Sequence, residues 1–164
     1  RDGRRGFWGA LSLGAGAEQV NFRNDGLGYS DPLTRGVFAI RLGGTLSPHV
    51  RLGGEVGAWV NEDRGITETV GGAMLIGQFY PSERTGFFLK AGAGVGRSGL
   101  SDDFGTLDED TGFVGALGIG WDVRLGRHVF LVPTVDFAAY TLDGNDGDYN
   151  ERITSFGIGI AYQR

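Results

Sequence analysis

The stretch FVGALGIGWDVRL, residues Phe113–Leu125, alternates between two kinds of side chain. Every second residue from Phe113 onward is apolar or glycine, whereas the residues between them are small at first and end with Asp122 and Arg124. Successive side chains leave a β-strand on opposite faces, so this period of two predicts a strand. The stretch exceeds the roughly 5–6 residues of an ordinary soluble strand. It meets the length of about 9–11 residues that a tilted strand needs to cross a bilayer. We therefore predict a membrane-spanning strand with its apolar face toward lipid.

The composition is compatible with a barrel built from such strands. The 164 residues suffice for one domain, residues 1–164, with about eight strands. No apolar run approaches the roughly 18–20 residues of a membrane helix, but barrel strands hide their lipid face by alternation. The chain has no cysteine, which excludes disulfides, thiolate metal sites and a lipid anchor on cysteine. The charged start RDGRRG has no apolar signal segment, so an exported protein is expected here in its mature form.

Seven further stretches show the same alternation or are bounded on both sides by turn residues. The fourth of them has apolar residues on both faces, and we favour an outward direction for Ala73, Leu75 and Phe79. The predicted strands, with Phe113–Leu125 included, are Gly6–Phe22, Gly36–Leu46, Val50–Val60, Thr67–Tyr80, Phe87–Arg97, Phe113–Leu125, Val129–Thr141 and a last strand that includes residues 155–163.

The connections between these strands alternate between long and short. This asymmetry is typical of outer-membrane barrels, which have short periplasmic turns and longer external loops. An even number of up-and-down strands also lets the first strand pair with the last, so that no sheet edge faces lipid. We predict an all-β fold, an eight-stranded antiparallel up-and-down transmembrane β-barrel with both termini on the periplasmic side.

The longer connections hold most of the acidic residues. The last of them, Asp143–Asn150, has the composition of a calcium loop, but its spacing does not fit the EF-hand pattern. A solvated loop is the simpler interpretation, and binding of divalent cations that bridge lipopolysaccharide phosphates is the alternative. The candidate metal ligands are Asp143, Asn145, Asp146 and Asp148.

Arginines near the predicted external rim are candidates for direct contact with lipid phosphates, because guanidinium groups bind phosphate in a bidentate manner. These residues are Arg23, Arg35, Arg97 and Arg152.

Aromatic residues gather near the predicted strand ends, as expected where amphipathic rings lie at the two membrane interfaces. The girdle predicted near the short turns comprises Phe7, Trp8, Phe79, Trp121, Phe130 and Tyr162, and the girdle near the long loops comprises Phe22, Trp59, Phe113 and Tyr140.

The inward faces of the predicted strands carry four acids and four bases. An eight-stranded barrel is just wide enough inside for side chains to fill it, and buried charges need partners. The balance of charge predicts a plug of salt bridges, with a narrow ion path as the alternative. The residues of this predicted lumen network are Glu18, Arg41, Arg51, Glu55, Lys90, Asp122, Arg124 and Asp136.

The opening GFWGALSLGAGAE, residues 6–18, and the final SFGIGIAYQR, residues 155–164, resemble the small eight-stranded outer-membrane β-barrel proteins of the OmpA- and OmpX-like group. The resemblance implies the outer membrane of a Gram-negative-type bacterium, with lipid, lipopolysaccharide and the barrel-assembly machinery as partners. Members of the group usually end in an aromatic residue, whereas this chain ends Tyr162-Gln163-Arg164.

Enzymes exist among barrels of this kind, and their proton transfer generally requires a histidine at the external rim. Both histidines of this chain, His49 and His128, fall in predicted short turns at the opposite rim. We therefore expect no enzymatic activity, and the sequence indicates no cofactor. One lysine, an acidic balance and no basic stripe give no support to nucleic-acid binding.

Three functional hypotheses remain from the sequence. The first is a structural or interaction role, in which external loops meet lipopolysaccharide, cations or a protein partner. The second is a small pore or transport barrel. The third is a soluble lipocalin-like barrel that binds an apolar ligand, which requires an apolar interior and a polar exterior.

Overall fold

The computed structural model describes residues 5–22, 28–63, 65–102, 105–144 and 147–164. No helix in these ranges is long and apolar enough to cross a membrane. The strands are β1 (Phe7–Phe22), β2 (Leu33–Ser47), β3 (Val50–Asp63), β4 (Ile66–Phe79), β5 (Phe87–Asp102), β6 (Gly105–Trp121), β7 (Val123–Arg124), β8 (Val129–Gly144) and β9 (Gly147–Gln163).

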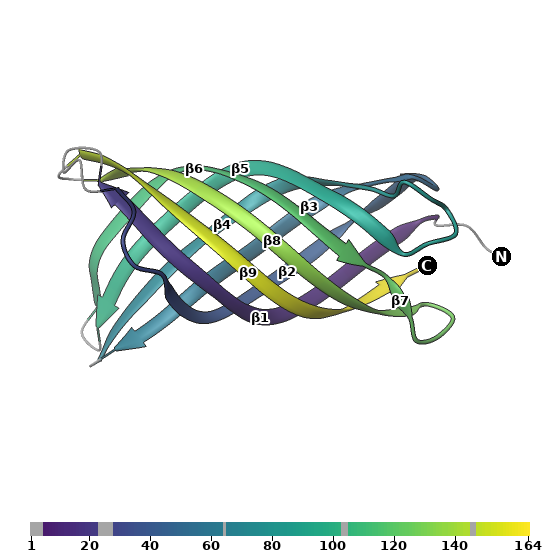
Figure 1. Ribbon diagram of the computed structural model, residues 1–164, viewed down its shortest axis with the longest axis horizontal. Coiled ribbons are helices and arrows are strands. Elements are labelled where there is room, and N and C mark those ends of the chain that lie inside the picture. Colours follow the sequence, from purple (N-terminus) through teal and green to yellow (C-terminus); the bar gives the residue numbers. More distant parts are fainter. Residues whose placement is uncertain (1–4, 23–27, 64, 103–104, 145–146) are drawn as a thin grey trace.

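These strands form a closed antiparallel up-and-down barrel of eight strands, with the two residues of β7 continuing β6 along β8. Each strand pairs with its neighbours in the chain, and β1 pairs with β9 from Trp8↔Gln163 to Phe22↔Tyr149. The ribbon shows the strongly tilted strands, with both termini at the end that also carries the turn after β7 (Figure 1). The predicted fold class and closure are therefore confirmed, and both termini lie at the same end of the barrel.

The predicted external loops are shorter than expected, because the strands continue into them as paired hairpins. The predicted loop Ser98–Thr111 is largely strand, with β5 and β6 paired as far as Asp102↔Gly105. The predicted loop Asp143–Asn150 is likewise occupied by the ends of β8 and β9, which pair as far as Gly144↔Gly147. Polar residues occupy both faces there, so the alternation that marks a strand in lipid is absent from the sequence.

The opening stretch Phe113–Leu125 is also divided differently from the prediction. Its first part belongs to β6, which ends at Trp121, and β7 begins at Val123. Between them the backbone N–H of Asp122 donates to the carbonyl oxygen of Gly86, at 2.9 Å, which extends the ladder between β5 and β6 by one pair. β7 pairs with β8 in the same register as β6, so Asp122 keeps its inward parity and its side chain is buried inside the barrel.

The alternation of each strand separates an apolar exterior from a lumen filled with polar and aromatic side chains. On β4, for example, Leu75 and Phe79 are 80% and 49% exposed, whereas Met74 and Gln78 are buried. The outward direction predicted for Ala73, Leu75 and Phe79 is confirmed. The outward apolar side chains form a belt around the barrel, which we call the apolar band. On β1 it runs from Phe7 to Ala17 and on β9 from Tyr162 to Phe156.

Candidate functional site: a charged lumen

The lumen at the end that holds the termini is organised around Arg51. Its guanidinium lies 3.0 Å from a carboxylate oxygen of Asp122 and also donates to the hydroxyl of Tyr80 and the side-chain oxygen of Gln163. The Tyr80 hydroxyl donates in turn to Asp122, at 3.0 Å. The rings of Tyr80 and Trp8 lie 4.9 and 5.6 Å from the guanidinium carbon, within the range of cation–π interactions. One cation, one anion and two aromatic rings therefore fill this layer.

The middle layer of the lumen contains two cations and two anions. Glu55 on β3 accepts from Arg41 on β2 and from Lys90 on β5, the latter at 2.7 Å. Asp136 on β8 lies 2.8 Å from Lys90 and 3.3 Å from Arg41. All four groups are buried or half-buried, and each contacts two partners of opposite charge. Such reciprocal pairing offsets the cost of removing these charges from water.

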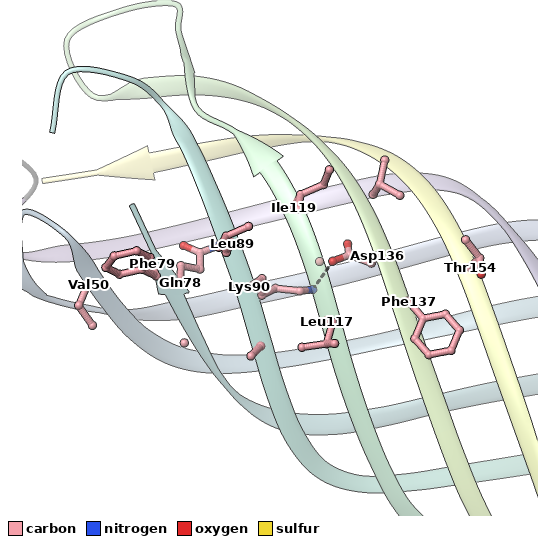
Figure 2. Close-up of a pocket in the computed structure, with 14 residues that line it drawn as sticks. Val50, Gln78, Phe79, Leu89, Lys90, Leu117, Ile119, Asp136, Phe137 and Thr154 are labelled. Atoms are coloured by element: carbon pink, nitrogen blue, oxygen red, sulfur yellow. Dashed lines mark ion pairs between the residues drawn. The ribbon is translucent and has the colours of Figure 1, made fainter. Parts of the chain in front are cut away.

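The ion pair between Lys90 and Asp136 depends on a glycine. Lys90 on β5 pairs with Gly118 on β6, and Gly118 pairs with Asp136 on β8, so the three residues form one row across the barrel wall. Figure 2 shows the lysine and the aspartate joined by an ion pair, and the register places Gly118 between their two strands. A Cβ atom built on Gly118 would overlap the Asp136 carboxylate. The missing side chain of Gly118 therefore leaves the space in which the two charged side chains meet.

A small cavity of about 70 Å³ lies next to the middle layer. Arg41 and Asp136 line it on one side, and Trp59 and Tyr140 are among the large side chains that line it on the other. The indole N–H of Trp59 donates to the carbonyl oxygen of Gly16 at 2.9 Å, which fixes the ring across the lumen. The cavity has room for a few water molecules.

The layer at the external end has a different charge balance. Glu18 on β1 and Glu151 on β9 are 4% and 3% exposed, and their side chains point into the lumen. Ser98 donates to one oxygen of Glu151 at 3.3 Å. One oxygen of each carboxyl group, Oε1 of Glu18 and Oε2 of Glu151, is buried without a hydrogen-bond partner. Among the described residues, no buried lysine or arginine lies in this layer, since Arg41, Arg51 and Lys90 belong to the other two.

The external layer is covered by Tyr149, which lies on β9 beyond the apolar band. Its hydroxyl donates to Asp110 on β6 at 2.8 Å. Burial and this acidic partner raise the pKa of Tyr149 above its ordinary range, so the hydroxyl stays protonated and keeps donating.

Of the predicted lumen network, Arg124 is placed wrongly. It is exposed at the end of β7, where its guanidinium carbon lies 5.5 Å from the ring of Phe130. Arg124 has the same parity as Asp122 but is the last residue of β7, so it lies at the rim of the barrel. The other predicted members lie inside, namely Glu18, Arg41, Arg51, Glu55, Lys90, Asp122 and Asp136.

The aromatic girdles also differ from the prediction, because four of the predicted rings point inward. Their positions near the strand ends suggested the membrane–water interface, but the alternation along each strand places their side chains on the lumen face. The inward rings are Trp8, Trp59, Phe130 and Tyr140. The outward rings are Phe7, Phe79, Trp121 and Tyr162 at the end with the termini, and Phe113 at the other. The side chain of Phe22 lies outside the described residues.

The predicted external-rim arginines face three different surroundings. Arg97 is exposed and forms an ion pair with Glu109, and Arg152 lies 3.7 Å from the ring centroid of Tyr29. Arg35 is exposed and donates to Asn61 at 2.7 Å. Arg23 lies outside the described residues.

The metal candidates give no site within the part of the chain that the structure describes. Asp143 is exposed, Asn145 and Asp146 lie outside the described residues, and so does the side chain of Asp148. In the described ranges, no group of three or more His, Cys, Asp or Glu residues is arranged to hold a metal ion.

A pocket of about 700 Å³ forms a furrow on the outer wall (Figure 2). Two neighbouring rows of outward side chains form its sides, with Leu89 and Ile119 in one row and Leu117 and Phe137 in the other. The backbone of residues such as Gly118 forms its floor, and the charged side chains of that row point into the lumen. The furrow is therefore part of the apolar band and not a polar reaction centre.

Several lumen residues were not predicted from the sequence. Glu151 was assigned to the edge of a loop, and Tyr80, Gln78 and Gln163 were not recognised as partners of Arg51 or its neighbours. Each of them lies an even number of positions from an inward residue on its own strand. Continuing the alternation to the strand ends would therefore have predicted that they point into the lumen.

Comparison with known proteins identifies the kind of barrel. The outer membrane protein beta-barrel domain family matches residues 4–163. The chain belongs to this family. As an outer membrane protein β-barrel, it lies in the outer membrane of a Gram-negative-type bacterium. Among curated proteins, none matches the sequence.

Solved structures of other outer-membrane barrels share the fold at low sequence identity. Neisserial surface protein A is 15% identical with a TM-score of 0.68, and the match covers 99% of this chain and 100% of that chain. Ail, the attachment invasion locus protein of Yersinia pestis, is also 15% identical, with a TM-score of 0.61 and coverage of 96% and 99%. The outer membrane protein AlkL is 16% identical, with a TM-score of 0.54 and coverage of 100% and 93%. At these identities the likeness shows the fold.

The Gly118 row gives a direct test of the lumen network. We expect Gly118→Ala to lower the free energy of unfolding by about 1–3 kcal/mol, because the new methyl group displaces Asp136 from Lys90. Urea unfolding in lipid vesicles, followed by the heat-dependent shift in gel mobility, measures the change.

Gly115→Ala is the matched control, because Gly115 lies on the same strand, faces outward and has no atom within 4 Å of an added Cβ. Equal stabilities of the two variants would contradict the role assigned to Gly118.

Proposed function

We propose that this outer membrane barrel is closed to solutes and acts through its external surface, in a structural or interaction role. The observation that carries the proposal is the filled lumen. The ion-paired layers around Arg51 and Glu55 lie in series, and Trp59 and Tyr140 lie across the lumen beyond them. A solute would have to break several buried ion pairs, each costly to separate.

The two alternatives have less support. A lipocalin-like barrel requires an apolar lumen, whereas here Arg41, Glu55 and Lys90 are buried inside and residues such as Leu75 are exposed outside. A pore requires a continuous passage, whereas the lumen cavity of about 70 Å³ is bounded by large side chains on one side and by ion pairs on the other.

The external surface favours partners that carry cations or lipid phosphates. The ends of β3 and β6 present exposed acids, including Glu62, Asp63 and Glu109. Arg97 and Arg152 have outward parity just beyond the apolar band, at the level where lipid headgroups meet the barrel. We propose that these arginines bind lipopolysaccharide phosphates and that cations bridge further phosphates to the acids.

The ligand of one similar structure does not carry over to this chain. Ail has been solved in complex with the heparin analogue sucrose octasulfate, at 13% identity and a TM-score of 0.54. A sulfated polyanion would meet exposed carboxylates such as Glu62 and Asp63 here, and like charges repel. The charge of the external surface thus favours a cationic partner, such as a cationic protein surface.

We propose a non-enzymatic role, and the position of the two histidines supports it. His49 lies near Glu83, 3.4 Å away, and His128 lies near the carbonyl oxygen of Gln163, 2.8 Å away, both in short turns at the periplasmic rim. A general base at the external rim would have to be another group. The barrel-assembly machinery is proposed as a further partner, with Tyr162 as the last outward aromatic residue of β9.

A conductance measurement tests the closed lumen. In planar lipid bilayers we expect no steady current through the wild-type barrel at moderate voltage, because its ion pairs and Trp59 obstruct the lumen. A steady current that is abolished by replacing Arg41 or Glu55 would contradict the proposal and favour the pore.

A binding measurement tests the external surface. We expect the double variant Arg97→Ala, Arg152→Ala to bind purified lipopolysaccharide at least several-fold more weakly than wild type in isothermal titration in detergent, because two phosphate ligands are lost. Arg84→Ala is the control, since Arg84 is exposed in the short turn between β4 and β5 at the opposite rim. An equal loss in this control, or no loss in the double variant, would contradict the assignment.

A further inference from the structure

The two carboxyl groups of the external layer lie on the two strands of the seam that closes the barrel. Glu18 on β1 pairs in register with Ile153 on β9, and Glu151 pairs with Val20, so the two acids are diagonal neighbours on the lumen face. Side chains in diagonal positions of an antiparallel pair are within reach of each other. The seam between β1 and β9 thus holds two acids without matching cations among the described residues, whereas the other two layers of the lumen pair acids with bases.

On β3, β4, β5, β6 and β8, the described groups around this pair are neutral or acidic. Ser98 on β5 donates to Glu151, and Tyr140 on β8 pairs with Glu151 in register. On β4 and β6 the inward groups are Glu68 and Asp110, both acids. On β3 the nearest polar groups are the indole of Trp59, which donates to Gly16, and the amide of Asn61, which donates to Glu68 at 3.5 Å.

The one inward cation near this level is on β2. Arg35 is exposed at the lumen mouth, and its guanidinium donates to Asn61 and to the carbonyl oxygen of Thr34. It contacts neither of the two seam acids in the structure. The layer therefore carries two buried carboxyl groups with one unpartnered oxygen each, and its one nearby cation among the described residues, Arg35, is a diagonal neighbour of Glu18 in register but donates to Asn61 and Thr34.

Two ionised carboxylates in this position would be costly. An isolated buried charge costs several kcal/mol, and two like charges at close range add repulsion. A metal ion would need several oxygen ligands, and no described group of three or more acidic, histidine or cysteine residues is arranged to hold one. A proton needs no cavity, and two carboxyl groups that share one proton satisfy an oxygen on each side, as in other carboxyl pairs.

We propose that Glu18 and Glu151 form a one-proton site that holds the external half of the β1–β9 seam together at neutral pH. Glu151 lies beyond the apolar band, flanked by the outward Arg152 and Asn150. Burial and the neighbouring carboxyl group of Glu18 raise the pKa of Glu151 to about 8, which agrees with this site. Because the two groups are coupled, the titration belongs to the pair.

The sign of the pH dependence follows from the raised pKa. In the unfolded chain a glutamate ionises near pH 4.5, whereas the folded pair keeps its proton to about pH 8. Below pH 4.5 both states are protonated and the pair imposes no penalty. Between these values the folded state binds more protons than the unfolded state, so stability falls as the pH rises. Loss of the last proton leaves two like charges across the seam.

Urea unfolding of the wild-type barrel in lipid vesicles at a series of pH values tests the proposal. We expect the urea midpoint of the wild type to fall between pH 6 and pH 9, a range chosen to bracket the pKa of about 8. In Glu18→Gln and Glu151→Gln the midpoint should change less over this range and exceed that of the wild type at its alkaline end. Glu62→Gln, which removes an exposed acid at the same rim, should keep the wild-type profile.

Infrared spectroscopy of the wild type keeps the test independent of variant folding. A carbonyl band of a protonated carboxyl group should be present at neutral pH and disappear on alkaline titration, and it should be absent from Glu151→Gln. A profile identical in wild type and both seam variants would overturn the proposal. So would a missing band together with stabilisation by calcium or sodium chloride that the seam variants lose, which would assign the site to a metal cation.

Discussion

The closure of the β1–β9 seam is the constraint on which the rest of the structure depends. In lipid, a backbone N–H or C=O group without a partner costs several kcal/mol, so a sheet can cross only when its first and last strands pair. The register from Trp8↔Gln163 to Phe22↔Tyr149 satisfies this requirement along the whole seam. Once the sheet is closed, every strand must put one face outward into hydrocarbon and the other into a lumen that only side chains can fill.

The narrow lumen explains why its contents are both charged and closely fitted. Each layer has to fill its cross-section and to balance its charge, and the layers around Arg51 and Glu55 meet both conditions. Gly118 shows how the filling is arranged, since its missing side chain is the space in which Lys90 and Asp136 meet. The external layer fills its section but does not balance its charge among the described residues, and there we infer a shared proton between Glu18 and Glu151.

The sequence predicted what depends on the alternation of a single strand and missed what depends on the pairing of several. Alternation was sufficient to place Arg41 and Lys90 inside and Leu75 outside. It failed where another rule was given priority, as for Trp8 and Trp59, which were assigned to girdles by their position near strand ends despite their inward parity. The hairpin of β5 and β6 carries polar residues on both faces, so no alternation marked it. The meeting of Lys90 and Asp136 over Gly118 depends on the register of three strands, which composition and period do not determine.

The most direct test of the account is a nitroxide scan along residues 113–121 of β6 in lipid vesicles. The chain has no cysteine, so each introduced cysteine carries the only label. Oxygen, which concentrates in the bilayer, should collide often with labels at Gly115, Leu117 and Ile119 and seldom with labels at the positions between them. A water-soluble paramagnetic reagent should reach none of the outward positions within the apolar band. Access of that reagent to Leu117 and Ile119, with oxygen favouring the inward positions instead, would contradict a barrel with its apolar face toward lipid and its polar face toward the lumen.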